Sequence, residues 1–204
     1  DLRDTIPNFV RTFGGFFCNS SEDLGAMCNL GFGLNMSYLM LENVSPAQTY
    51  SSALATVKNP QDIVDSVYQM MVALAIAYQR KHFTHYDLHV NNFMEYDFVN
   101  NPDFMKLFKV HPSDERIGAV LFKYYVTPNQ IIWVPAKYLY VILDYGFTFV
   151  DGMPPNMMHF PAEAKKWGAT SDKPNPMSDL YTVLISLLQQ LLTSNRDVII
   201  KNGV

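Results

Sequence analysis

The stretch that decides the fold is His85-Tyr86-Asp87-Leu88-His89-Val90-Asn91-Asn92, in which Asp87 and Asn92 stand five positions apart. Further along, the apolar run 138–143 leads directly into Asp144-Tyr145-Gly146. Carboxylate and amide oxygens are the hard ligands that Mg²⁺ prefers in proteins. Asp87, Asn92 and Asp144 are therefore the first candidates for a polar site, and the segments around them must bring them together.

The segment before this stretch predicts a helix. Asn59 is a favourable N-cap, Pro60 suits the first turn, and Asp62 places negative charge where the helix dipole favours it. Arg80-Lys81 complement the other end of the dipole. Between the two ends, apolar residues recur at helical spacing: Ile63, Val67, Met70, Met71, Leu74 and Tyr78.

A second helix is predicted after Ser178, with Asp179 in its first turn. Its apolar residues form an unusually complete stripe, which is typical of a helix that faces the core. The stripe consists of Leu180, Val183, Leu184, Leu187, Leu188 and Leu191.

Short apolar and β-branched runs predict strands elsewhere. The first forty residues suggest two or three strands, separated at Gly14-Gly15 and by later polar residues. Three more are predicted over 119–126, 130–134 and 138–143, with breaks at Pro128-Asn129 and Pro135. Helices and strands together predict the α+β class.

Composition limits the functions to consider. The 204 residues are 49% hydrophobic and 14% aromatic, which is enough for a substantial core. A net charge of -4 gives no indication of a nucleic-acid or anionic-membrane partner. Cys18 and Cys28 lack the spacing of a zinc site, and we expect two free thiols. The apolar run Val67–Tyr78 is too short to cross a bilayer, which takes about 20 residues.

Together and in this order, the two motifs resemble the catalytic loop (H-x-D-L-x-x-x-N) and the D-F-G motif of protein kinases. The resemblance implies a kinase-like α+β fold that is mainly the helical C-terminal lobe. It divides the chain into residues 1–44, the last strands of the N-lobe with the hinge, and residues 45–204, the C-lobe. Within the C-lobe lie the catalytic loop 85–92, a strand-rich insertion 97–137 and the metal motif 144–146.

The resemblance also implies roles for single residues. Asp87 would orient the acceptor hydroxyl and take its proton, while Asn92 and Asp144 would bind the Mg²⁺ ions that bridge the phosphates of ATP. The segment 38–44 resembles the hinge, which makes Glu42 a candidate nucleotide contact. The remaining candidates are His85 and Asp179 as structural supports of the loop and His89 as a contact to substrate or phosphate.

Several positions depart from the usual kinase pattern. Tyr86 replaces the arginine before the catalytic aspartate, His89 replaces a lysine, and 52 positions separate Asn92 from Asp144. This pattern is closest to haspin-type kinases and to the divergent kinase-like proteins of large DNA viruses. Gly31-Phe32-Gly33 lacks the third glycine of a phosphate-binding loop, and Pro161-Ala162-Glu163 is a rough match to Ala-Pro-Glu.

The resemblance implies transfer of the ATP γ-phosphate to a hydroxyl, with serine or threonine of a protein substrate as the expected acceptor. One alternative is a pseudokinase or structural component, for instance of a virus particle, and another, favoured by His89, is a small-molecule kinase. The chain starts at Asp1 without a methionine, so we expect a piece of a longer protein. The missing nucleotide-binding lobe would lie upstream, come from another chain or be absent. An intracellular location, cytoplasmic or nuclear, is expected, or a virion if the source is viral.

Overall fold

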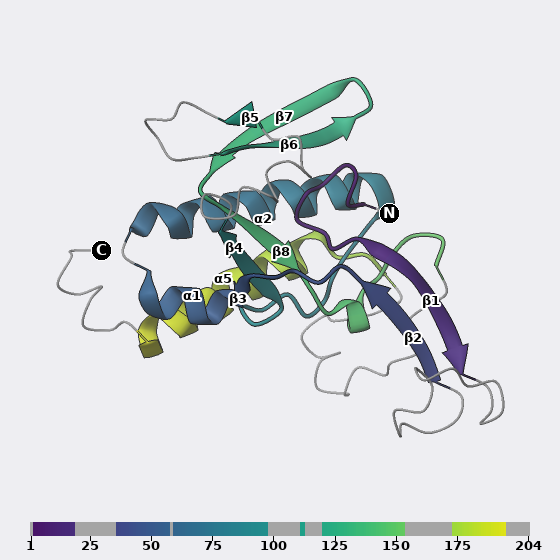
Figure 1. Ribbon diagram of the computed structural model, residues 1–204, viewed down its shortest axis with the longest axis horizontal. Helices are drawn as coiled ribbons and strands as arrows, with labels where there is room; N and C mark the ends of the chain where they lie inside the picture. The colour runs from purple at the N-terminus through teal and green to yellow at the C-terminus, as the bar shows by residue number, and fades with distance from the viewer. Residues whose placement is uncertain are drawn as a thin grey trace.

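The computed structural model describes residues 2–18, 36–57, 59–97, 111–112, 120–153 and 173–194. Helices and antiparallel sheets occur together, which confirms the α+β class (Figure 1). The helices are α1 (Tyr50–Thr56), α2 (Pro60–Lys81) and α5 (Pro176–Ser194). The strands are β1 (Thr12–Cys18), β2 (Met36–Leu41), β3 (Ala47–Thr49), β4 (Phe93–Asp97), β5 (His111–Pro112), β6 (Val120–Thr127), β7 (Gln130–Ala136) and β8 (Tyr138–Ile142).

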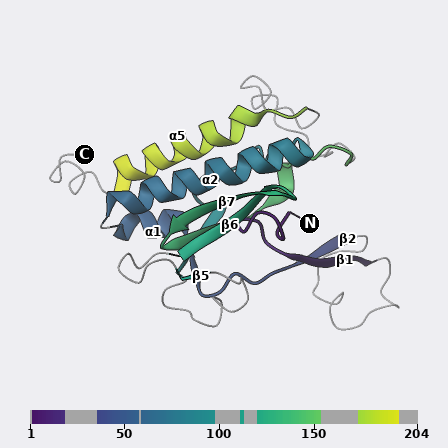
Figure 2. The same cartoon turned by 90° about the horizontal axis from the view of Figure 1, so that it is seen from above.

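The long helix α2 is the centre of the arrangement. It contacts α5 and β8, and Figure 2 shows α2 and α5 side by side above the β6–β7 hairpin. The predicted helix is confirmed with its cap, since the Asn59 side chain accepts the Gln61 N–H at 3.0 Å. At the other end, His82 adopts a left-handed conformation (φ 46°) and its N–H bonds the Tyr78 carbonyl at 2.8 Å. Among the described residues, no helix is long and apolar enough to span a membrane.

The sheet β3-β4-β8 carries both predicted motifs at one end. Strands β4 and β8 are antiparallel, with Phe93 opposite Ile142 and Asp97 opposite Tyr138. The chain enters β4 from the loop 85–92 and leaves β8 toward residues 144–146, so both segments emerge at the same end of the strand pair. Three elements in this region are not predicted from the sequence. Strand β3 has only three residues and α1 only seven, and β4 contains two acidic residues, which are unusual in a strand.

A two-stranded sheet of β1 and β2 extends to one side of the molecule (Figure 1). The predicted break at Gly14-Gly15 is wrong, because β1 continues through both glycines. Gly15 lies where β2 passes closely, and a Cβ there would be 3.0 Å from the Tyr38 carbonyl oxygen. The glycine therefore permits the strands to approach and does not end one of them.

The predicted strand-rich insertion contains the β6–β7 hairpin, with its turn at Pro128-Asn129 as expected. Pro135 does not end the second strand, since β7 continues to Ala136. This strand is at the edge of the sheet β5-β6-β7, where a missing N–H donor is tolerated. Residues 98–110 and 113–119 of the predicted insertion lie outside the described residues.

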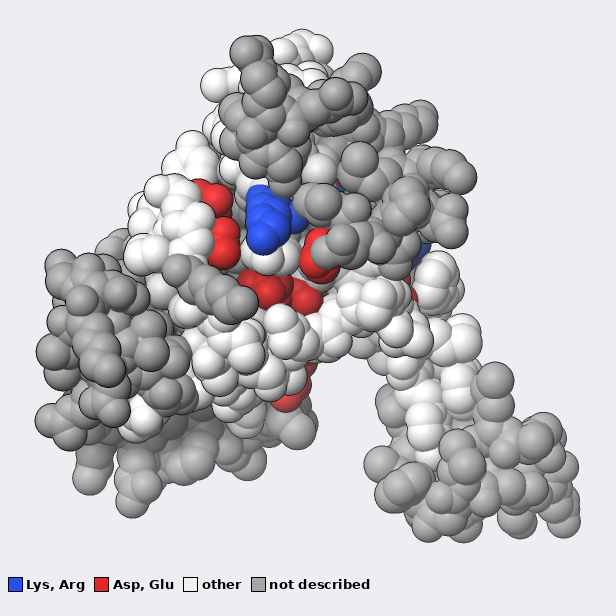
Figure 3. All heavy atoms as spheres, turned by 60° about the vertical axis from the view of Figure 1, so that its left-hand side comes forward, with Lys and Arg blue, Asp and Glu red and all other residues white. Residues whose placement is uncertain are grey.

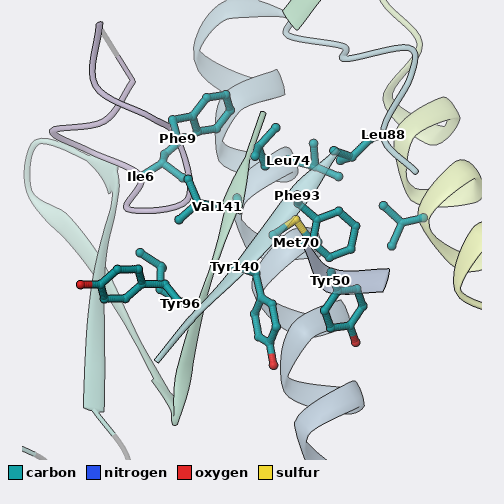
Figure 4. Close-up of a cluster of buried hydrophobic side chains, with 14 of the residues drawn as sticks. Ile6, Phe9, Tyr50, Met70, Leu74, Leu88, Phe93, Tyr96, Tyr140 and Val141 are labelled. Carbon is teal, nitrogen blue, oxygen red and sulfur yellow. The ribbon is translucent and has the colours of Figure 1, made fainter. Parts of the chain in front are cut away.

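Aromatic side chains fill the core between α1, α2 and the β3-β4-β8 sheet (Figure 4). The Tyr50 ring is 4.7 Å from that of Phe93 and 5.2 Å from that of Tyr140, measured between centroids. Met70, from α2, is fully buried in the same cluster. The segment that carries the loop 85–92 is thus attached to a rigid, close-packed base.

Helix α5 begins at Pro176, two residues before the predicted start. The prediction that the whole leucine stripe faces the core is only partly confirmed. Val183 and Leu187 are buried, whereas Leu184 is 43% exposed and Leu188 is 53% exposed. The leucines are spread over more than one face of α5. Contact with α2 therefore buries only some of them.

A buried asparagine attaches the N-terminal segment to the core. Asn8 donates from Nδ2 to Gln69 Oε1 at 3.2 Å and to the Tyr140 carbonyl at 2.7 Å, and its Oδ1 accepts the Tyr124 hydroxyl at 2.7 Å. Its own carbonyl accepts the Ile142 N–H at 2.7 Å. The first residues of the chain therefore lie directly beside β8.

We expect Asn8→Ala to lower the free energy of unfolding by about 3 kcal/mol, because it takes a partner from two buried acceptors, Gln69 Oε1 and the Tyr140 carbonyl, and from one buried donor, the Tyr124 hydroxyl. Urea denaturation followed by circular dichroism measures the loss. Asn43→Ala, at an exposed position, is the matched control and should change stability by less than about 0.5 kcal/mol. Equal stability of the two variants would contradict the role assigned to Asn8.

Candidate functional site

The loop after α2 is held in place by backbone contacts on two sides. Thr84 exchanges both backbone hydrogen bonds with Phe149, at 3.0 and 2.8 Å, and its hydroxyl accepts the Asn175 N–H at 2.9 Å. Tyr86 adopts a left-handed conformation with φ 66°, which is unusual for a large side chain. The loop 85–92 therefore has a fixed shape that the surrounding segments impose.

Asp179, in the first turn of α5, holds the start of this loop. Its carboxylate accepts the His85 N–H at 2.7 Å and the Tyr86 N–H at 2.8 Å, and the residue is 3% exposed. Burial raises the pKa of Asp179 to about 6, although the two N–H donors act in the opposite direction. The carboxylate satisfies two backbone donors that would otherwise be buried without a partner.

His85 joins the two motifs through its ring. Nε2 donates to the Leu143 carbonyl at 2.7 Å, and Nδ1 accepts the Asp87 N–H at 3.3 Å. Burial lowers the pKa of His85, so the ring is neutral with its proton on Nε2. Because both ring nitrogens are engaged by the backbone, His85 has the geometry of a structural support.

Asp87 and Asn92 are in direct contact. The Asn92 Nδ2 donates to the Asp87 backbone carbonyl at 2.8 Å and to its carboxylate Oδ2 at 3.1 Å. The Asn92 carbonyl accepts the Leu143 N–H at 2.8 Å. Since both amide hydrogens face Asp87, the Asn92 Oδ1 is the side-chain atom available to a cation.

Asp144 follows Leu143, whose N–H and carbonyl are bound by Asn92 and His85 respectively. The Asp144 side chain is exposed, and its Oδ1 accepts the Gly146 N–H at 3.3 Å. Its backbone is left-handed, with φ 55°. The structure thus brings Asp87, Asn92 and Asp144 to the same end of the β4–β8 pair.

Tyr145 packs below this end of the strand pair. Its ring stacks on Phe9 with centroids 6.1 Å apart and lies 5.7 Å from the His85 ring. Its hydroxyl donates to the Ile142 carbonyl at 2.8 Å and accepts the Val10 N–H at 3.4 Å. The sequence gives no signal for Phe9 as a neighbour of this motif, because the two are far apart in the chain.

Glu42, the candidate nucleotide contact, has its carboxylate engaged within the chain. Oε1 pairs with the buried Arg3 at 3.1 Å, and Oε2 accepts the Arg11 N–H at 3.0 Å. A nucleotide at the segment 38–44 would therefore meet the backbone and not this carboxylate. Sequence reasoning missed Arg3, since a single arginine near the start of the chain forms no pattern.

His89 lies beside Asp87, with Nε2 3.8 Å from the Asp87 Oδ1. Its Nδ1 accepts the Asn91 N–H at 3.2 Å, so Nε2 carries a proton and faces the carboxylate. About a third of each side chain in this pair is exposed. A substrate that reaches Asp87 would also reach His89.

Tyr86, which departs from the kinase pattern, is buried and its hydroxyl donates to the Lys173 carbonyl. Together with the bond from Asn175 to Thr84, this contact ties the segment before α5 to the loop. In the sequence, Tyr86 is notable only because it stands where the kinase pattern has an arginine. Nothing in the sequence indicates its contact with Lys173.

The donor set consists of hard oxygens, which suits Mg²⁺. In the part of the chain that the structure describes, neither Asp87 nor Asp144 pairs with a lysine or arginine, and no group of three or more His, Cys, Asp and Glu residues could hold a metal. Two carboxylates and one amide form a sparse set. Mg²⁺ accepts such a set when water and phosphate oxygens complete its coordination.

No family model matches this chain, and no curated protein is significantly similar to it in sequence. Several positions singled out in the sequence lie outside the described residues: Gly31-Phe32-Gly33, the segment 161–163, Cys28 and the side chain of Cys18.

Proposed function

We propose that this chain carries the hydroxyl-orienting and magnesium-binding residues of an ATP-dependent phosphotransferase with a kinase-like C-lobe. The acceptor would be a hydroxyl, with serine or threonine of a protein as the first candidate. The observation that supports the proposal most strongly is the position of Leu143, whose backbone is bound by Asn92 on one side and His85 on the other. Two segments that are 52 positions apart thereby present their polar residues together.

Asp87 has the geometry of a group that orients a hydroxyl. Its Oδ2 is fixed by Asn92, and its Oδ1 faces His89 and solvent. A carboxylate held in this way can accept a hydrogen bond from an incoming hydroxyl and take its proton as the oxygen attacks. Its restricted orientation favours one direction of approach.

Asn92 Oδ1 and the Asp144 carboxylate would hold Mg²⁺, which when bound neutralises charge on the phosphate oxygens of ATP. Asn92 is nearly buried and Asp144 is exposed, so the chain supplies one rigid and one solvent-facing ligand. Asp179 and His85 act through the backbone and keep the loop in the shape that this geometry needs.

The test is Asp87→Asn, which keeps the shape of the side chain and removes its basicity. We expect phosphate transfer from ATP to fall by about 10²- to 10⁴-fold, which is the usual contribution of a general base. Affinity for Mg²⁺-ATP should change little. Transfer is measured with labelled ATP on two acceptor sets, serine- and threonine-containing peptides and small alcohols.

Asp151→Asn is the matched control, since Asp151 is exposed and lies at the C-terminal end of α2, where its N–H bonds the Lys81 carbonyl. Equal transfer by the two variants would contradict the role of Asp87. Binding of Mg²⁺-ATP without any transfer would favour the alternative of a pseudokinase, which binds nucleotide and does not catalyse. Transfer to small alcohols alone would replace the protein substrate by a small molecule.

A further inference from the structure

A cavity of about 460 Å³ lies at the end of the β4–β8 pair that is opposite to Asp144. It is bounded by the end of α1, the start of α2 and the strands β3, β4 and β8. Polar side chains and a few apolar contacts line it: Gln48, Ala53, Thr56, Val57, Asn59, Asp62, Glu95, Lys137 and Tyr138. Its volume is within the usual range for a small-molecule site.

Two carboxylates dominate the charge of this cavity. Asp62 and Glu95 line it, and burial raises the pKa of both. Glu95 accepts a hydrogen bond from Gln48 Nε2 at 3.2 Å, and the Tyr140 hydroxyl also acts on it as a donor. Among the residues with a described position, neither carboxylate forms an ion pair with a lysine or an arginine. Lys137 acts on Asp62 through its charge but forms no direct ion pair with it within the described residues. A partly desolvated carboxylate without a direct ion pair gains more from an incoming cation than a fully hydrated one does.

Further acidic residues add to the negative potential at the edge of the cavity. Asp65 acts on Asp62, and Asp97 acts on both Glu95 and Lys137. Figure 3 shows this face, where acidic groups lie around a basic group in a hollow of the surface. The described side chains thus place more negative than positive charge around the cavity.

Lys137 indicates how a cation can be held there. Its Nζ lies over the Tyr138 ring, 4.7 Å from the centroid, and the pKa of Lys137 is raised by the Tyr138 hydroxyl first and then by Asp62 and Asp97. Lys137 is itself exposed, so its ammonium stays at the rim. The aromatic face and the carboxylates form the two kinds of contact that organic cations use in proteins.

We propose that this cavity binds a small organic cation, an alkylamine or a guanidinium compound, through the carboxylates of Asp62 and Glu95. Ala53, Val57 and Tyr138 would contact its carbon chain, and Gln48 and Asn59 would provide further hydrogen bonds. The proposal is independent of the phosphotransfer chemistry, since the lining residues belong to neither the loop 85–92 nor the segment 144–146.

The test uses isothermal titration calorimetry at low ionic strength, with agmatine as the guanidinium probe and spermidine as the amine probe. We expect the unaltered chain to bind at least one of them. Asp62→Asn and Glu95→Gln should each weaken binding by about tenfold or more, the usual effect of losing a hydrogen bond to a charged group. Lys137→Met should strengthen binding several-fold, because it removes a competing positive charge.

Asp151→Asn removes the same charge at the opposite end of α2 and should leave the affinity unchanged. Thermal unfolding shows whether each variant is folded, and the strengthened binding of Lys137→Met cannot result from misfolding. Absence of binding with both probes would overturn the proposal, as would equal affinity of the chain and its two carboxylate variants. Binding of an arginine-containing peptide without binding of free agmatine would also overturn it, since the site would then recognise a protein.

Discussion

Replacing Asp179 by alanine will lower the free energy of unfolding by about 3 kcal/mol at pH 7 and will disorder the loop that carries Asp87. The variant leaves the N–H groups of His85 and Tyr86 buried without an acceptor, and each such loss costs about 1–3 kcal/mol. Urea denaturation gives the stability. The matched control is Asp151→Ala, whose side chain is 65% exposed, and a similar loss in that variant would contradict the role of Asp179.

The effect of Asp179→Ala should also depend on pH. The folded-state pKa is about 6, above the unfolded value of 3.8, so the folded protein holds the proton more tightly. The stability that Asp179 contributes is therefore fully present below about pH 4 and decreases as pH rises to about 6. Asp179→Ala should be more destabilising at pH 4 than at pH 7. The opposite trend would show that the hydrogen bonds to the charged form outweigh burial.

Asp144→Asn should weaken the binding of Mg²⁺-ATP by about 100-fold, the effect expected when one charged partner of a close ionic contact is removed. Asparagine tolerates the left-handed backbone at this position and can still accept the Gly146 N–H, so the fold should not change. Alanine would remove the same ligand but would add strain at φ 55°. Calorimetry with ATP, in the presence and absence of Mg²⁺, measures the effect.

Removal of Mg²⁺ with a chelator provides the matched comparison. It should reduce the affinity of the unaltered chain to that of Asp144→Asn and should change the variant little. Full Mg²⁺-dependent affinity in Asp144→Asn would show that the metal assignment is wrong, even if the chain binds nucleotide in another way.

Parts of the fold with local signals could be predicted from the sequence. The start of helix α2 is predicted by Asn59-Pro60 and its end by Arg80-Lys81, because caps and charges that complement the helix dipole lie within a turn of each end. The strands around Pro128-Asn129 follow from the turn between them. Helix α5 begins earlier than the sequence pattern after Ser178 predicts, because Asn175 caps it: its Oδ1 accepts the Met177 N–H.

Long-range contacts could not be predicted in the same way. The motif order suggested that Asp87, Asn92 and Asp144 form one site, and the structure places them at one end of a strand pair. The groups that hold them there are backbone atoms of Leu143 and side chains such as Asn8, which have no local pattern. A contact between residues more than 50 positions apart leaves a trace in a single sequence only when a known motif is involved.

The bonds on both sides of Leu143 also restrict how the chain can move. Its N–H and carbonyl are both occupied, and the hydroxyl of the next aromatic residue, Tyr145, is bound to Val10 and Ile142. Moving the backbone of the segment 143–145 would require these bonds to break together, which makes such a motion a local unfolding step. We therefore expect the segment 143–145 to open rarely and the amide hydrogen of Leu143 to exchange slowly. The exposed Asp144 side chain, by contrast, is held by the Gly146 N–H at 3.3 Å. Any ligand that needs the backbone of this segment in another position must supply the free energy of that opening.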